Sequence, residues 1–200
     1  GLPPEQSDNA QRVARIHEFL SRWPLLSRDA RRALDVGAGM GVFLAQFLRS
    51  GWTGVAVEPD PVAAAHLREI ATFEVVEGLY FGEPELGQFD LITLNKVVEH
   101  VREPVEMLRQ ISRGIKPESG VLYVEVPDLV TAAARPPQDN ALGALHHHLY
   151  HPRSLAELFA HAGLECLHAE RVLDPSGKLT VCGYAVLPLA LDRWAQLNAP

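Results

Sequence analysis

Apolar residues recur along this chain in two patterns, which predict strands that alternate with helices. In residues 9–20, Val13, Ile16 and Leu20 follow helical spacing, so this segment is expected to form an amphipathic helix. Short apolar runs bounded by glycine or proline are typical of buried strands. The expected strands cover residues 32–38, 53–59, 73–78, 89–95 and 120–127, and further helices are expected at 42–51, 61–71, 104–115 and 154–163.

The end of the chain breaks this alternation. Residues 164–173 and 178–187 are two further expected strands, and the Asp-Pro-Ser-Gly segment between them predicts a hairpin. Strands that alternate with helices predict an α/β fold with a mostly parallel sheet covered on both faces. The hairpin adds one antiparallel strand. Residues 128–151 lack clear periodicity, and long irregular loops in compact domains are more often functional than idle.

Composition narrows the class of protein. The 200 residues, 47% of them hydrophobic, suit one domain with a sizeable core. No window approaches the ~20 consecutive apolar residues of a membrane span, and the first residues do not resemble a signal peptide. The net charge of −7 argues against nonspecific binding to nucleic acid or anionic membranes. Cys166 and Cys182 cannot form a disulfide framework, although one pairing stays open, so a cytoplasmic protein is expected.

The most informative segment is LDVGAGMGVF, residues 34–43, where an expected strand runs through three glycines into a helix. Glycines let the backbone turn tightly and approach a ligand, and a helix N-terminus offers free N–H groups. Glu58 ends the next strand, where an acid can bind both hydroxyls of a ribose. The glycines could instead serve the turn alone, with Glu58 in solvent. Both signals together favour a ligand that contains a nucleoside.

Three segments resemble the class I S-adenosylmethionine-dependent methyltransferases. They are LDVGAGMGVF, the acidic VAVEPD at 55–60, and residues 89–128 with VVEHV after the strand and KPESG before the next. A pyrophosphate-binding turn has the form G-x-G-x-x-G, whereas this chain has G-x-G-x-G preceded by Asp35. The resemblance covers roughly residues 30–187. It implies a doubly wound, mostly parallel seven-stranded sheet with a reversed last strand.

The resemblance also implies the cofactor, S-adenosyl-L-methionine, and its contacts. The backbone around Gly37 and Gly39 would hold the methionine end, Asp35 would orient its amino group, and Glu58 would bind the ribose. Many relatives carry an acid after the third strand, whereas Leu79 here offers only an apolar surface to the adenine ring. The residues expected to bind the cofactor are Asp35, Gly37, Ala38, Gly39, Glu58, Pro59, Leu79 and Asn95.

The segment ALHHHLYHPRSL, residues 144–155, is rich in histidine. Adjacent histidines point in divergent directions and make a poor zinc site, so no metal is expected. A polar surface loop is one interpretation. The resemblance instead places His148 and Tyr150 at the acceptor pocket, with His146 as the alternative if the register slips. His100, after the fourth strand, borders this pocket or only holds the next loop by a hydrogen bond.

The resemblance divides one methyltransferase domain into three parts: a helical lid at 1–30, a cofactor-binding half at 31–127, and an acceptor loop, helix and hairpin at 128–200. The expected reaction is methyl transfer to a hydroxyl or carbon of a small molecule, such as a sugar or a secondary metabolite. His148 would be the general base, because histidine titrates near neutral pH. The alternatives are a noncatalytic cofactor-binding or partner-binding domain and a nicotinamide-dinucleotide enzyme.

Overall fold

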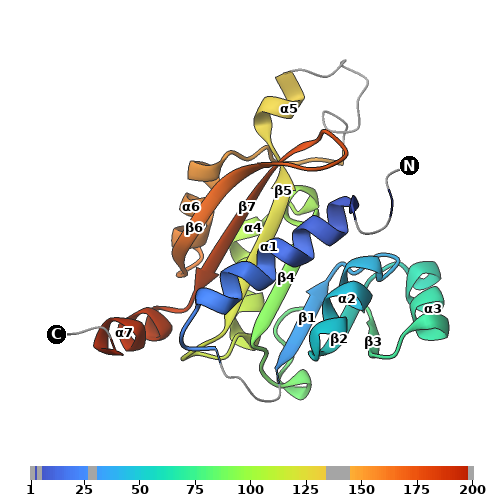
Figure 1. Cartoon of the computed structure of the whole chain (residues 1–200), viewed down its shortest axis with the longest axis horizontal. Helices are drawn as coiled ribbons and strands as arrows, with labels where there is room; N and C mark the ends of the chain where they lie inside the picture. Colours follow the sequence, from blue (N-terminus) through green and yellow to red (C-terminus); the bar gives the residue numbers. More distant parts are fainter. Residues whose placement is uncertain (1–2, 4–5, 27–30, 134–144, 198–200) are drawn as a thin grey trace.

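A seven-stranded sheet forms the centre of the molecule (Figure 1). The structure, a computed structural model, describes residues 3, 6–26, 31–133 and 145–197. The strand order is β3-β2-β1-β4-β5-β7-β6, in which β1 to β5 pair in parallel and β7 is antiparallel to both of its neighbours. This order confirms the expected α/β fold with a reversed last strand. The strands are β1 (Arg32–Val36), β2 (Thr53–Glu58), β3 (Glu74–Glu77), β4 (Leu91–Asn95), β5 (Val121–Pro127), β6 (Glu165–Leu173) and β7 (Leu179–Val186).

Helices cover both faces of the sheet, as the parallel strands require. One buried apolar cluster joins the sheet to α4 and α6, and a second cluster joins the opposite face to α1, α2, α3 and α7. The helices are α1 (Asp8–Arg22), α2 (Val42–Phe47), α3 (Pro61–Ile70), α4 (Pro104–Ile111), α5 (Leu129–Ala133), α6 (Pro152–His161) and α7 (Pro188–Leu197). Short 3-10 turns follow several elements, among them η2 (Leu48–Ser50), η3 (Pro84–Leu86), η4 (Val98–His100) and η5 (Ser112–Gly114).

Two helices depart from the expected pattern. The segment 128–151 begins with α5, and α7 follows the last strand, whereas the sequence predicted neither helix. Residues 134–144 of the expected acceptor loop lie outside the described residues. The helix predicted at 42–51 is split between α2 and η2, which ends at Gly51 with a φ of +86°. A left-handed residue of this kind is the common end of a helix.

Polar residues line the sheet face that α1 covers. Asp35, Thr93 and Tyr123 are in register on neighbouring strands. From α1, Arg12 and Arg15 reach the buried carboxylate of Glu125 at 2.5 and 2.7 Å. These ion pairs fix α1 on the sheet near the carboxyl ends of the strands (Figure 1). The expected lid at 1–30 stays a prediction. The cavity at the ends of β1 to β3 has no α1 residue in its lining.

Two further observations bear on the expected cellular setting. None of the described helices is long and apolar enough to span a membrane. Cys166 is exposed and Cys182 is buried, and both are free thiols, so the pairing that the sequence left open does not occur.

Candidate active site

A cavity of about 460 Å³ lies where β1, β2 and β3 end, opposite the segment that follows β4. This is the switch point of the sheet, because β2 lies on one side of β1 and β4 lies on its other side. Ligands of open α/β sheets bind at this place. The expected cofactor residues that line the cavity are Gly37, Glu58, Pro59 and Leu79, joined by the predicted acceptor-side residue His100. The lining does not include Asp35, Ala38, Gly39 or Asn95, which lie next to it.

The glycine turn is bound to the end of β2. The N–H groups of Gly37 and Ala38 donate to the Val57 carbonyl at 2.8 and 3.2 Å. These two N–H groups are therefore paired within the chain. The expected contact of this turn with the cofactor would use other backbone atoms, and it stays a prediction. Gly37 has a φ of +73°, and a Cβ there would lie 2.6 Å from the Val97 side chain. Glycine is needed at this position because the β4 loop packs directly against the turn.

Glu58 holds the same turn through its side chain. Its Oε2 accepts a hydrogen bond from the Gly39 N–H at 2.6 Å, and its Oε1 accepts one from the Asp60 N–H at 2.9 Å. The residue is only 7% exposed. Two backbone donors fix the carboxylate at the cavity wall, so its remaining lone pairs are held in a fixed orientation. This geometry suits two neighbouring hydroxyl groups.

Asp35 is buried beneath the turn. Its Oδ1 accepts hydrogen bonds from the Thr93 hydroxyl at 2.6 Å and from the Asn95 amide at 3.2 Å. Burial raises the pKa of Asp35 to about 7, although the Thr93 hydrogen bond and the charge of Arg12 act in the opposite direction. The carboxyl group is therefore near its midpoint of ionisation at neutral pH. The Asn95 side chain orients Asp35, a contact that the sequence did not predict.

A pH dependence follows from this pKa. If the Asp35 carboxylate receives the ammonium group of the cofactor, only its ionised form binds well, so lower pH should weaken binding. With a pKa of about 7, the affinity for S-adenosylhomocysteine should fall by about tenfold between pH 8 and pH 6. Calorimetric titration across this range measures the effect. Asp35→Asn should bind more weakly and lose most of the dependence, and an unchanged dependence in that variant would exclude Asp35 as its source.

The histidine loop lies beside the cavity, and its side chains have different environments. His146 packs against His100 with ring centroids 4.7 Å apart. The Nε2 of His148 instead lies 3.2 Å from the Arg102 carbonyl oxygen. Tyr150 is 5% exposed and packs in the apolar cluster under α6, and its hydroxyl has no hydrogen-bond partner among the described residues. The structure thus brings His146 to His100, while Tyr150 belongs to the core.

Sequence reasoning missed part of the cavity wall. The wall includes three residues from the start and outer face of α4, which are Glu103, Glu106 and Gln110. The sequence predicted only a helix at 104–115, so nothing distinguished these residues from a solvated face. Lys96 also lines the cavity, and its φ of +59° is unusual for a residue other than glycine. Such strain often marks a functional site, but it is not visible in a sequence.

Similar proteins agree with this architecture. Residues 6–169 match a family model described as a methyltransferase domain. The chain is 32% identical over 133 residues to the mitochondrial ubiquinone biosynthesis O-methyltransferase of Saccharomyces cerevisiae, covering 62% of this chain and 41% of that protein. It is 28% identical over 94 residues to the ubiquinone biosynthesis O-methyltransferase of Pseudomonas aeruginosa, covering 44% and 40%. The alignments therefore span about two fifths of the length of these curated relatives.

Solved structures share the fold at lower identity. The Burkholderia thailandensis 1,6-didemethyltoxoflavin-N1-methyltransferase with bound S-adenosylhomocysteine has a TM-score of 0.65 and 22% identity, covering 90% of this chain and 78% of that one. A putative methyltransferase of Haloferax volcanii, in complex with the Trm112 activator, has a TM-score of 0.68 and 17% identity, covering 91% and 90%.

The structure is a doubly wound α/β domain with a cavity at the switch point of its sheet. The family model covers more than three quarters of the 200 residues, so the chain belongs to the class I S-adenosylmethionine-dependent methyltransferase family.

Proposed function

We propose that this chain binds S-adenosyl-L-methionine and transfers its methyl group to an oxygen atom of a small molecule, with carbon acceptors as the second choice. One observation carries the proposal. The fixed carboxylate of Glu58 and the apolar surface of Leu79 share a cavity with His100, which meets His146 at the acceptor side. This arrangement supports a nucleoside site next to polar side chains that would hold an acceptor. The curated relatives named above are O-methyltransferases, which supports an oxygen acceptor.

The residues of this chain have mainly to bind and orient the reactants. The sulfonium of the bound cofactor supplies an activated methyl group. In the transfer, the acceptor oxygen would form a bond to the methyl carbon as the bond from that carbon to sulfur breaks, and the hydroxyl proton would pass to a base at the acceptor side or to water. Glu58 and Asp35 would fix the cofactor, while His100 and His146 would hold the acceptor in line with the methyl group. Placement of this kind accounts for a large part of the rate in two-substrate reactions.

Among the loop residues, the contacts favour His146 over His148 for the acceptor side. His146 faces His100, which lines the cavity, whereas His148 contacts the Arg102 backbone. The general base predicted at His148, and a role for Tyr150, stay predictions. The cytoplasmic compartment also stays a prediction, which the two free thiols fit because they suit a reducing setting. The proposed partner is a small-molecule acceptor.

The test is a screen of oxygen acceptors that follows the release of S-adenosylhomocysteine. With an accepted substrate, His146→Ala should lower kcat by about 10- to 100-fold, since a hydrogen bond to a developing charge contributes ~1.5–3 kcal/mol. Binding of S-adenosylhomocysteine should remain within about twofold, because Glu58 and Asp35 are intact. His161→Ala, at the exposed end of α6, is the matched control and should keep full turnover.

Two alternatives predict other results in the same experiments. A noncatalytic domain would bind S-adenosylhomocysteine but release none with any acceptor. A nicotinamide-dinucleotide enzyme would bind NAD in the calorimeter in preference to S-adenosylhomocysteine. Either pattern would exclude the proposed reaction.

A further inference from the structure

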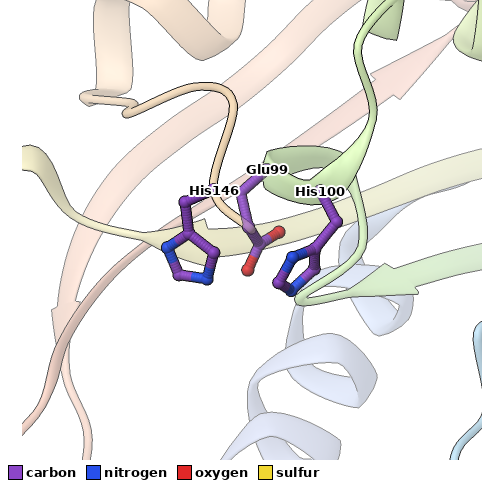
Figure 2. A group of neighbouring side chains, drawn as sticks. All are labelled: Glu99, His100 and His146. Carbon is purple, nitrogen blue, oxygen red and sulfur yellow. The ribbon is translucent and has the colours of Figure 1, made fainter. Parts of the chain in front are cut away.

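Three side chains with metal-binding atoms meet beside the cofactor cavity. Glu99 and His100 belong to η4, and His146 precedes α6. One oxygen of Glu99 and one ring nitrogen of each histidine all lie within 4.8 Å of one another. Figure 2 shows the Glu99 carboxylate between the two imidazole rings. We propose that these three residues bind a divalent transition-metal ion.

The environment of Glu99 supports a cation at this place. The residue is 1% exposed, and neither carboxylate oxygen has a hydrogen-bond partner within the described part of the chain. A buried polar group without a partner is costly, and a buried carboxylate is especially so. The ammonium group of Lys96 lies 3.3 Å from Glu125 and makes no hydrogen bond to Glu99. A metal ion between Glu99 and the two imidazoles would give the carboxylate oxygens a direct partner.

The orientation of His100 is that of a metal ligand. Its Nδ1 lies 2.9 Å from the Leu145 carbonyl oxygen, so a proton on Nδ1 donates to that oxygen and leaves the Nε2 lone pair free. Histidines that bind metals usually donate their second ring N–H to a backbone carbonyl or a carboxylate. The His147 N–H also donates to the Glu99 carbonyl at 2.8 Å. These two bonds tie the two segments together and bring His146 to the other ligands.

The ligand set selects the kind of ion. Two imidazole nitrogens and one carboxylate oxygen suit zinc, cobalt, iron or manganese, whereas magnesium and calcium prefer oxygen ligands alone. Metal–ligand distances are ~2.0–2.2 Å, so ligand atoms that lie up to 4.8 Å apart would draw together around an ion. His100 is exposed and His146 is half-buried, so both rings are accessible to an incoming ion. Three protein ligands also leave at least one position open.

A role for the open position rests on the proposed function, whereas the site itself does not. His100 lines the cofactor cavity, so an ion bound to its Nε2 would lie at the acceptor side. A hydroxyl group of the acceptor could take the open position and would lose its proton to solvent more readily there. The resulting oxygen would then receive the methyl group. The acceptor would thus be a molecule that binds metals through oxygen.

The test is a titration of the chelator-treated full chain, free of any affinity tag, with Co²⁺ and without cofactor or acceptor. Calorimetry should give one ion per chain, and the visible spectrum should show the bands of Co²⁺ with nitrogen ligands. Losing even a residue that only supports a ligand costs ~10- to 100-fold in metal affinity. We therefore expect His146→Ala and Glu99→Gln to bind at least about 100-fold more weakly. His148→Ala, in the same loop, should bind within about twofold of wild type.

The outcomes separate this proposal from methyl transfer. No Co²⁺ binding by the wild-type chain, or equal binding by His146→Ala, would overturn the metal site even if the chain methylates an acceptor. Ion binding that depends on His146 would support the site even if no acceptor is found. His146 is half-buried, so its variant decides the matter if Glu99→Gln does not fold.

Discussion

Replacing Glu58 with alanine is expected to weaken the binding of S-adenosylhomocysteine by about 10²- to 10⁴-fold. Two ribose hydroxyls would donate to this carboxylate, and a hydrogen bond to a charged group contributes ~1.5–3 kcal/mol. The same change removes the bonds from the Gly39 and Asp60 N–H groups, so the glycine turn loses its anchor. Calorimetric titration measures the dissociation constant directly.

A matched control separates this effect from a general loss of charge. Glu69→Gln, on the exposed side of α3, removes one acid outside the cavity lining and should leave binding unchanged. Glu58→Gln keeps the shape of the side chain and should fall between wild type and Glu58→Ala. If Glu58→Ala stays folded and binds S-adenosylhomocysteine as tightly as wild type, the acid serves only the turn and the cofactor lies elsewhere.

The second large effect concerns stability. Glu125→Gln should lower the free energy of unfolding by about 3–5 kcal/mol, because it leaves buried cations without their counter-charge. Arg12 and Arg15 bond to this carboxylate, and Lys96 lies 3.3 Å from it. A loss of this size in a chain of 200 residues should lower the Tm by roughly 6–20 °C, measured by calorimetry and by urea unfolding.

The pKa of Glu125 fixes the sign of this effect. Burial alone would raise it, but the hydrogen bond and charge of Arg12 and the charge of Lys96 hold it well below its usual range. A lowered pKa stabilises the fold at every pH above the unfolded value of ~4.3, so the full loss should appear at pH 7. Glu165→Gln, on the exposed face of β6, should change stability by less than about 0.5 kcal/mol. A change that small in Glu125→Gln would show that the cations are compensated in another way.

Much of the fold is determined by short-range patterns in the sequence. Every expected strand is present within a few residues of its predicted bounds. Most of them are short apolar runs bounded by turn residues, whereas β3 and β6 are only partly buried. The turn at Gly37 and the acid at Glu58 were also predicted, since they follow consecutive strands and parallel strands end at the same edge. This part of the site can therefore be predicted from local sequence patterns.

Only the tertiary structure decided the acceptor side. Glu99 and His100 meet His146 across about 45 residues of chain, through a hydrogen bond to the Leu145 carbonyl that no local pattern encodes. Four histidines within six positions look equivalent in the sequence, yet one contacts His100 and another contacts a backbone carbonyl of a different loop. Periodicity reports which face of an element is buried. It does not report how two irregular segments pack, because that depends on contacts distant in sequence.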